Sequence, residues 1–211
     1  MVRTILITGL ILFTGVFYLD AQTKTAASSK EASILSEINL SSQDIEVFKQ
    51  QTKQKVDEFQ QYIVTIGSKD EPMDKRNLAE REALKLFFAG AQIEISAIDA
   101  NGATVKVARP IQKYLARLKS LPYTKVVIKF YDIAYVSEFT KGPDGKYYSV
   151  ATIIQEFTGF NGDNIVYTDV TKKEVEIIID LVEDPFFHEK SWKIFLGDIK
   201  AAETKTTASK S

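Results

Sequence analysis

Asp132 is the carboxylate in this sequence with the clearest potential for acid–base chemistry. Counting by twos along the strand candidate 125–139 places it on one face with apolar neighbours: Val126, Ile128, Phe130, Ala134 and Val136. Burial there would raise its pKa and make it a general base or a hydrogen-bonding anchor. The alternative, which we favour, is a bulge between Phe130 and Ile133. A long bent strand requires such a break, which would turn Asp132 to water and bring Ile133 and Tyr135 inward.

Glu156 presents the same choice on the next strand candidate, 146–160, where it shares a face with Tyr148, Val150 and Ile154. The alternation there is mixed, so a solvent-facing carboxylate is again favoured.

Tyr114, Tyr131 and Tyr135 could add hydroxyl groups to an apolar cavity, although tyrosine is also ordinary in a half-exposed sheet. Trp192 opens the last strand candidate as core or cavity wall. The candidate ligand-binding residues are therefore Asp132, Tyr131, Tyr135, Glu156, Tyr114 and Trp192, and no catalytic residue is assigned.

His188 is the only histidine, and the sequence has no cysteine. It lies in DPFFHEKS, between two strand patterns, so we expect it in a connecting loop. A lone histidine has no partners for a transition-metal site or a Cys–His pair, and no Gly-x-Ser-x-Gly motif marks a nucleophilic serine. The sequence therefore predicts no metal site and no cofactor.

The first residues predict export. Arg3 is followed by an uncharged, mostly apolar run from Thr4 to Leu19, which is short for a spanning helix and typical of a signal peptide over 1–21. An uncleaved anchor is the alternative.

The absence of cysteine excludes disulfides and suits a bacterial envelope protein, periplasmic or secreted. A formal net charge of −1 without basic–aromatic interleaving argues against nucleic acid as a partner.

The rest of the chain reads as one domain, 41–202, between a flexible linker, 22–40, and a disordered tail, 203–211. Ser41 and Asp44 have capping-box spacing at the start of a first helix. The apolar stripe of that helix comprises Ile45, Phe48, Thr52, Val56, Phe59, Ile63 and Ile66. A second helix is expected over 74–89, a hairpin around 93–107 and a third helix from Pro110 to Pro122. Four antiparallel strand candidates then follow: 125–139, 146–160, 174–183 and 192–199.

This order of elements resembles the nuclear transport factor 2-like superfamily over residues 40–202. Two passages add to the likeness: ARPIQKYLARLKSLPYTKVVIKFYDIAYV and IVYTDVTKKEVEIII. The resemblance implies an α+β fold in which three amino-terminal helices and a hairpin pack in the concave face of a strongly bent antiparallel sheet of four to six strands. It also implies a cavity between sheet and helices, and it leaves the activity open.

We therefore expect an exported, non-catalytic binding or scaffold domain that engages a small apolar ligand or an envelope protein. The alternative is a small cofactor-independent isomerase or dehydratase, with Asp132 or Glu156 as base and Tyr131 or Tyr135 steadying the oxyanion. A homodimer formed through the sheet is also open. No stable membrane insertion is expected after signal cleavage.

Overall fold

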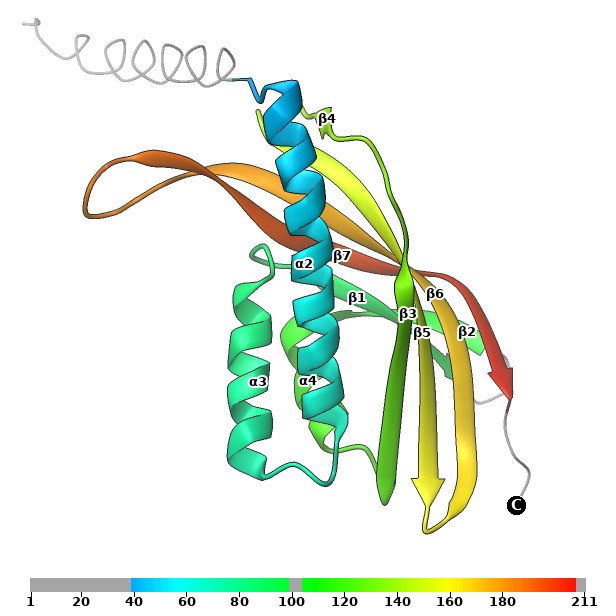
Figure 1. The fold of residues 1–211 in the computed structure, drawn as a ribbon. Coiled ribbons are helices and arrows are strands. Elements are labelled where there is room, and N and C mark those ends of the chain that lie inside the picture. The colour runs from blue at the N-terminus through cyan, green and yellow to red at the C-terminus, as the bar shows by residue number, and fades with distance from the viewer. Residues whose placement is uncertain (1–38, 99–103, 208–211) are drawn as a thin grey trace, which may run out of the picture. The chain divides into compact units, whose positions relative to one another are not determined.

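The computed structural model describes residues 39–98 and 104–207, and the fold set out below belongs to the compact unit that begins at Leu40. The expected signal peptide and most of the expected linker lie outside the described residues. The unit contains three described helices on one side of a bent seven-stranded sheet, so the expected α+β class is confirmed (Figure 1).

The helix α2, Ser42–Gly67, begins where the sequence places it. The Asp44 backbone N–H donates to Ser41 Oγ at 3.1 Å, and the Ser41 backbone N–H donates to Asp44 Oδ2 at 3.0 Å, so the capping box is formed. The stripe of the helix that is buried against the sheet contains Phe48, Thr52, Val56, Phe59, Ile63 and Ile66. The helical period therefore predicted this face correctly, except that Ile45 is only half-buried.

Two shorter helices lie beside α2: α3, Met73–Lys85, and α4, Ile111–Lys119. Arg76 of α3 is buried and connects all three helices. Its Nε donates to the Ile66 carbonyl at 2.8 Å, and its Nη2 donates to the Lys119 carbonyl at 2.8 Å. The guanidinium thus satisfies two carbonyls at helix carboxyl ends, which lack intrahelical donors.

The sheet has the strand order β2-β1-β7-β6-β5-β3, with the short β4 paired to β5 alone. The bounds of its strands are β1 Gln92–Ile98, β2 Thr104–Pro110, β3 Lys125–Val136, β4 Thr140–Lys141, β5 Tyr147–Asn161, β6 Asn164–Glu183 and β7 Lys190–Thr207. Neighbours pair antiparallel except β1 and β7, which meet in parallel at Ile93 and Ile199. The sheet is therefore mixed, with one strand more than the expected maximum.

Breaks in strand register accompany the bend. In β3 the register shifts between Tyr131 and Tyr135 opposite β5, which overlaps the bulge expected from the sequence. The direction of the Asp132 side chain falls outside the described residues. In β7 the register shifts opposite Lys172 and Lys173, and again between Val175 and Ile177.

The strand β6 shows the predicted alternation, with Val175, Ile177 and Ile179 buried on the helix side. It begins ten residues earlier than expected, at Asn164, so the segment interpreted as a connection is strand. The predicted tail is wrong at its start, because residues 203–207 complete β7 as a partner of β6. Among the described helices, none has the length and apolar character needed to cross a bilayer.

Candidate functional site

A cavity of about 200 Å³ lies between α4 and the concave face of the sheet. Its walls come from α4 and the segment that follows it, from β1, and from the middle of β5 and β6. The lining residues are Glu94, Ile95, Tyr114, Arg117, Leu118, Leu121, Tyr123, Gln155, Phe157, Tyr167, Asp169, Thr171 and Lys173.

Strand alternation explains why β6 supplies four of these side chains. Successive odd-numbered residues from Tyr167 to Lys173 lie on one face of the strand, and all four line the cavity. On β5, Gln155 stands opposite Thr171, and Phe157 stands opposite Asp169. The face of β6 that is apolar from Val175 onward is therefore mostly polar between Tyr167 and Lys173, where it lines the cavity.

Lys173 is the most unusual residue of the site. Only 6% of it is exposed, and its Nζ donates a hydrogen bond to Gln155 Oε1 at 2.9 Å. The same nitrogen lies 5.7 Å from the ring centroid of Tyr114. Within the described part of the chain, no carboxylate forms a salt bridge with it. Burial lowers the pKa of Lys173 to about 8, while the charge of Asp169 acts in the opposite direction.

Tyr114 projects from α4 into the same cavity. Burial, followed by the charge of Asp169, raises the pKa of Tyr114 well above its ordinary value, so its hydroxyl stays protonated. No residue described in the structure accepts a hydrogen bond from this hydroxyl. The cavity is therefore lined by a phenol and an amine, each of which can donate a hydrogen bond.

The two acidic residues of the cavity already have partners. Asp169 accepts a hydrogen bond from Thr171 Oγ1 at 3.0 Å. Glu94 Oε2 accepts from the backbone N–H of Ala201 at 3.1 Å, close to the register shift of β7 opposite Lys173. Each carboxylate therefore already accepts a hydrogen bond from the protein. Lys173 and Tyr114 still have N–H and O–H groups that could donate to a ligand.

Three aromatic rings form one part of the cavity wall. The ring centroids of Tyr123 and Phe157 are 5.8 Å apart, and those of Phe157 and Tyr167 are 5.9 Å apart. Tyr123 also covers Gly159, where an added β-carbon would lie 2.8 Å from the ring. A side chain at position 159 would therefore displace Tyr123 from its place in the wall.

Of the residues predicted from the sequence, the structure brings Tyr114 alone into this cavity among those whose side chains are described. Tyr131 and Glu156 lie on the opposite face of the sheet, where the Tyr131 hydroxyl donates to Glu156 Oε2 at 2.6 Å. Trp192 packs edge-on against Tyr147, with centroids 5.6 Å apart. The side chains of Asp132 and Tyr135 lie outside the described residues.

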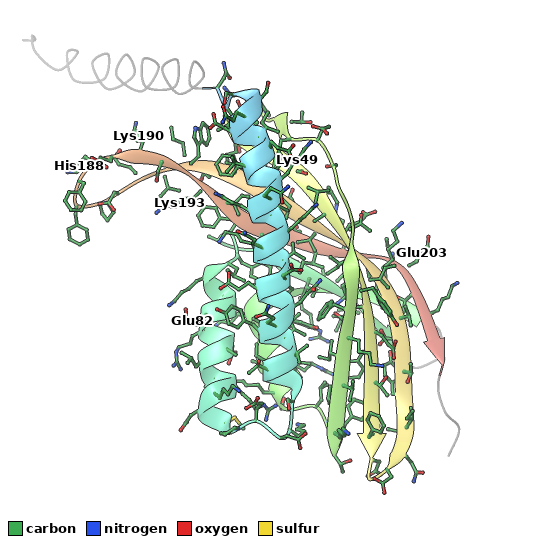
Figure 2. The ribbon with its side chains drawn as sticks, viewed as in Figure 1. Lys49, Glu82, His188, Lys190, Lys193 and Glu203 are labelled. Carbon is green, nitrogen blue, oxygen red and sulfur yellow. The ribbon has the colours of Figure 1, made fainter. Side chains whose placement is uncertain are left out.

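His188 lies at the tip of the β6–β7 hairpin, which projects beyond the helices, with Lys190 on the adjoining strand (Figure 2). It is exposed, has a φ of 55°, and places Nδ1 2.9 Å from Glu183 Oε1. The expectation of a loop is thus confirmed. Among the described residues, no cluster of three His, Cys, Asp or Glu side chains is arranged to hold a metal ion.

Sequence reasoning missed Lys173, Asp169 and Gln155. Polar side chains occupy both faces of residues 167–173, a pattern that favours a connection over a strand. The available signal was the odd-numbered face itself, which runs from Tyr167 into Val175 and Ile177 without a break.

No family model and no curated protein matches this chain. Two solved structures are similar to it at low identity. The Kfla4162 protein from Kribbella flavida is 13% identical, with a TM-score of 0.40 over 74% of this chain and 94% of that one. The yeast UBP3-associated protein BRE5 is 14% identical, with a TM-score of 0.34 over 81% of this chain and 100% of that one.

Proposed function

We propose that this domain is a binding module for a small, largely apolar molecule that carries an oxygen acceptor such as a carboxylate. The ligand would occupy the cavity between α4 and the sheet. The observation that carries the proposal is Lys173, a buried cation whose hydrogen-bonding partner within the described chain is the neutral amide oxygen of Gln155.

The hydrogen-bond donors that line the cavity indicate which kind of ligand would bind. An ammonium group has three N–H donors, and one of them is used by Gln155. The Tyr114 hydroxyl adds a donor that has no acceptor among the described residues. Both groups line the cavity, so a ligand oxygen bound there could accept hydrogen bonds from them.

The walls limit the rest of the ligand. Leu118, Leu121 and Phe157 make much of the lining apolar, as is usual for small-molecule sites. A cavity volume of about 200 Å³ is below the range of sites for drug-sized ligands. A single aromatic ring with one polar group has suitable dimensions and chemistry.

Benzoate is the probe that tests this function. Isothermal titration calorimetry should show that the protein binds benzoate in preference to benzylamine, which has the same ring and the opposite charge. Lys173→Met should abolish benzoate binding, whereas Lys172→Met, which changes the exposed neighbour on the same strand, should leave it intact. Binding of benzoate that is equally strong in Lys173→Met, or no binding by the wild type, would contradict the proposal.

We also propose that the domain works outside the cytoplasm as an exported member of the nuclear transport factor 2-like superfamily. The apolar run from Thr4 to Leu19 and the helix-then-sheet order of the fold support this placement. Amino-terminal sequencing of the protein recovered from the cell envelope should find Gln22 as the first residue. An intact Met1 on that material would contradict cleavage.

A further inference from the structure

Lys173 differs from an ordinary anion-binding lysine because burial favours its uncharged form. A neutral amine has a lone pair, which makes it a nucleophile toward carbonyl carbon. This inference rests on the proposed function, since it concerns the same cavity. We propose that Lys173 binds small aldehydes and ketones covalently, as an imine formed on its side-chain nitrogen.

The surroundings of the nitrogen favour this chemistry. The side chain is 6% exposed, so few water molecules can stabilise the ammonium form. Gln155 Oε1 accepts one N–H at 2.9 Å, which holds the nitrogen in place, and Lys173 lines the cavity. With a pKa of about 8, about a tenth of the side chains are free amine at pH 7.

Two other lysines show why burial by itself is insufficient. Lys69 also has a lowered pKa, first through burial and then through the charge of Arg76. Its Nζ, however, donates to the carbonyls of Lys119 and Leu121 at 3.1 and 3.0 Å. Lys119 is held by an ion pair with Glu80. Neither of these two lines the cavity, whereas Lys173 does.

The reaction balances without a further reagent. The Lys173 nitrogen adds to the carbonyl carbon, and the carbonyl oxygen takes a proton to give a carbinolamine, while the nitrogen loses one. Tyr114, whose ring centroid is 5.7 Å from the nitrogen, lines the same cavity and has a protonated hydroxyl that could donate a hydrogen bond to the carbonyl oxygen. The carbinolamine oxygen then takes a second proton, which balances the one that the ammonium form of Lys173 released to become a free amine. The C–O bond breaks, water leaves, and the nitrogen lone pair forms the C=N bond of a protonated imine. Asp169, on the same face of β6, offsets the charge of the protonated imine.

Reductive trapping tests the proposal. The full-length mature protein is incubated with benzaldehyde and sodium cyanoborohydride, which converts an imine into a stable benzylamine, and is then analysed by intact mass and peptide mapping. Lys173 should acquire a benzyl group about tenfold faster than the exposed Lys172, because its amine is less protonated at neutral pH. Tyr114→Phe should slow the labelling of Lys173 while leaving that of Lys172 unchanged.

Matched variants exclude a general effect on folding. Lys172→Met should retain fast labelling at position 173, and Lys173→Met should lose the fast phase while keeping slow labelling elsewhere. Excess benzoate should protect Lys173. Labelling of Lys173 no faster than that of Lys172 would overturn the proposal.

Failure of this inference is distinguishable from failure of the proposed function. If calorimetry shows benzoate binding that depends on Lys173 but trapping finds no benzyl group there, the cavity binds acceptors without forming imines. If neither benzoate binding nor trapping is seen, both proposals are wrong.

Discussion

Lys173 of β6 and Gln155 of β5 are joined across the concave face of the sheet by a 2.9 Å hydrogen bond between Nζ and Oε1. The two residues are not direct cross-strand partners, because Gln155 stands opposite Thr171 and Lys173 stands opposite Ile153. The bond is therefore diagonal, within the reach of long side chains. The Lys173 ammonium group is thus buried with a neutral acceptor. The free energy of unfolding should therefore depend on the protonation of this group.

We predict that the free energy of unfolding of the wild type rises with pH relative to that of Lys173→Met. Below pH 8 the amine is protonated in both states, and burial of its charge destabilises the native state. Between pH 8 and 10.5 the unfolded chain keeps the proton that the native protein has lost, so stability rises. The full effect approaches about 3 kcal/mol.

Urea unfolding of both proteins at a series of pH values measures this difference. The comparison with Lys173→Met is needed because Tyr114 and Tyr148, whose pKa values are raised, lower the stability above pH 10 in both proteins. Lys172→Met provides the control and should follow the wild type. A constant difference between wild type and Lys173→Met across this range would show that the Lys173 amine is not desolvated.

A second prediction concerns Arg76 and the helices that it joins. Arg76→Met should lower the free energy of unfolding by about 3 kcal/mol, because two buried carbonyls lose charge-assisted hydrogen bonds. Arg81→Met, at an exposed position of the same helix, should change it by less than about 0.5 kcal/mol. Equal effects of the two substitutions in urea unfolding would contradict the role given to Arg76.

A third prediction concerns Gly159 beneath the ring of Tyr123. Gly159→Ala should destabilise the protein by about 1–3 kcal/mol, because the added methyl group meets the ring at 2.8 Å. In a Tyr123→Ala background the same substitution should cost much less. A double-mutant cycle by thermal unfolding measures this coupling, and additive effects would exclude the ring as the cause.

The helices and the core faces of the strands were predictable because burial there follows a simple period. The stripe from Phe48 to Ile66 repeats every three to four residues, and Val175, Ile177 and Ile179 occupy every second position of β6. These patterns arise wherever one face of an element packs against apolar side chains. Ser41 and Asp44 likewise marked the first helix through local chemistry alone.

The site was less predictable because its inward face is polar. Asp169, Thr171 and Lys173 face a cavity instead of a packed core, so the alternation between apolar and polar residues disappears at the point of interest. Asp132 and Glu156 stand out in the sequence as carboxylates in otherwise apolar strands. Glu156 instead faces away from the cavity with Tyr131, because the odd-numbered residues of β5 form its buried face. The parallel pairing of β1 with β7 has no local signal.

That parallel pairing determines when the sheet can be completed during synthesis. The strand β7 lies between β1 and β6, although it follows all the other described strands in the sequence. Until it arrives, the hairpin of β1 and β2 has no neighbour on its inner side, and β6 has an open edge. Two strand edges therefore stay unpaired until residues 190–207 join the sheet.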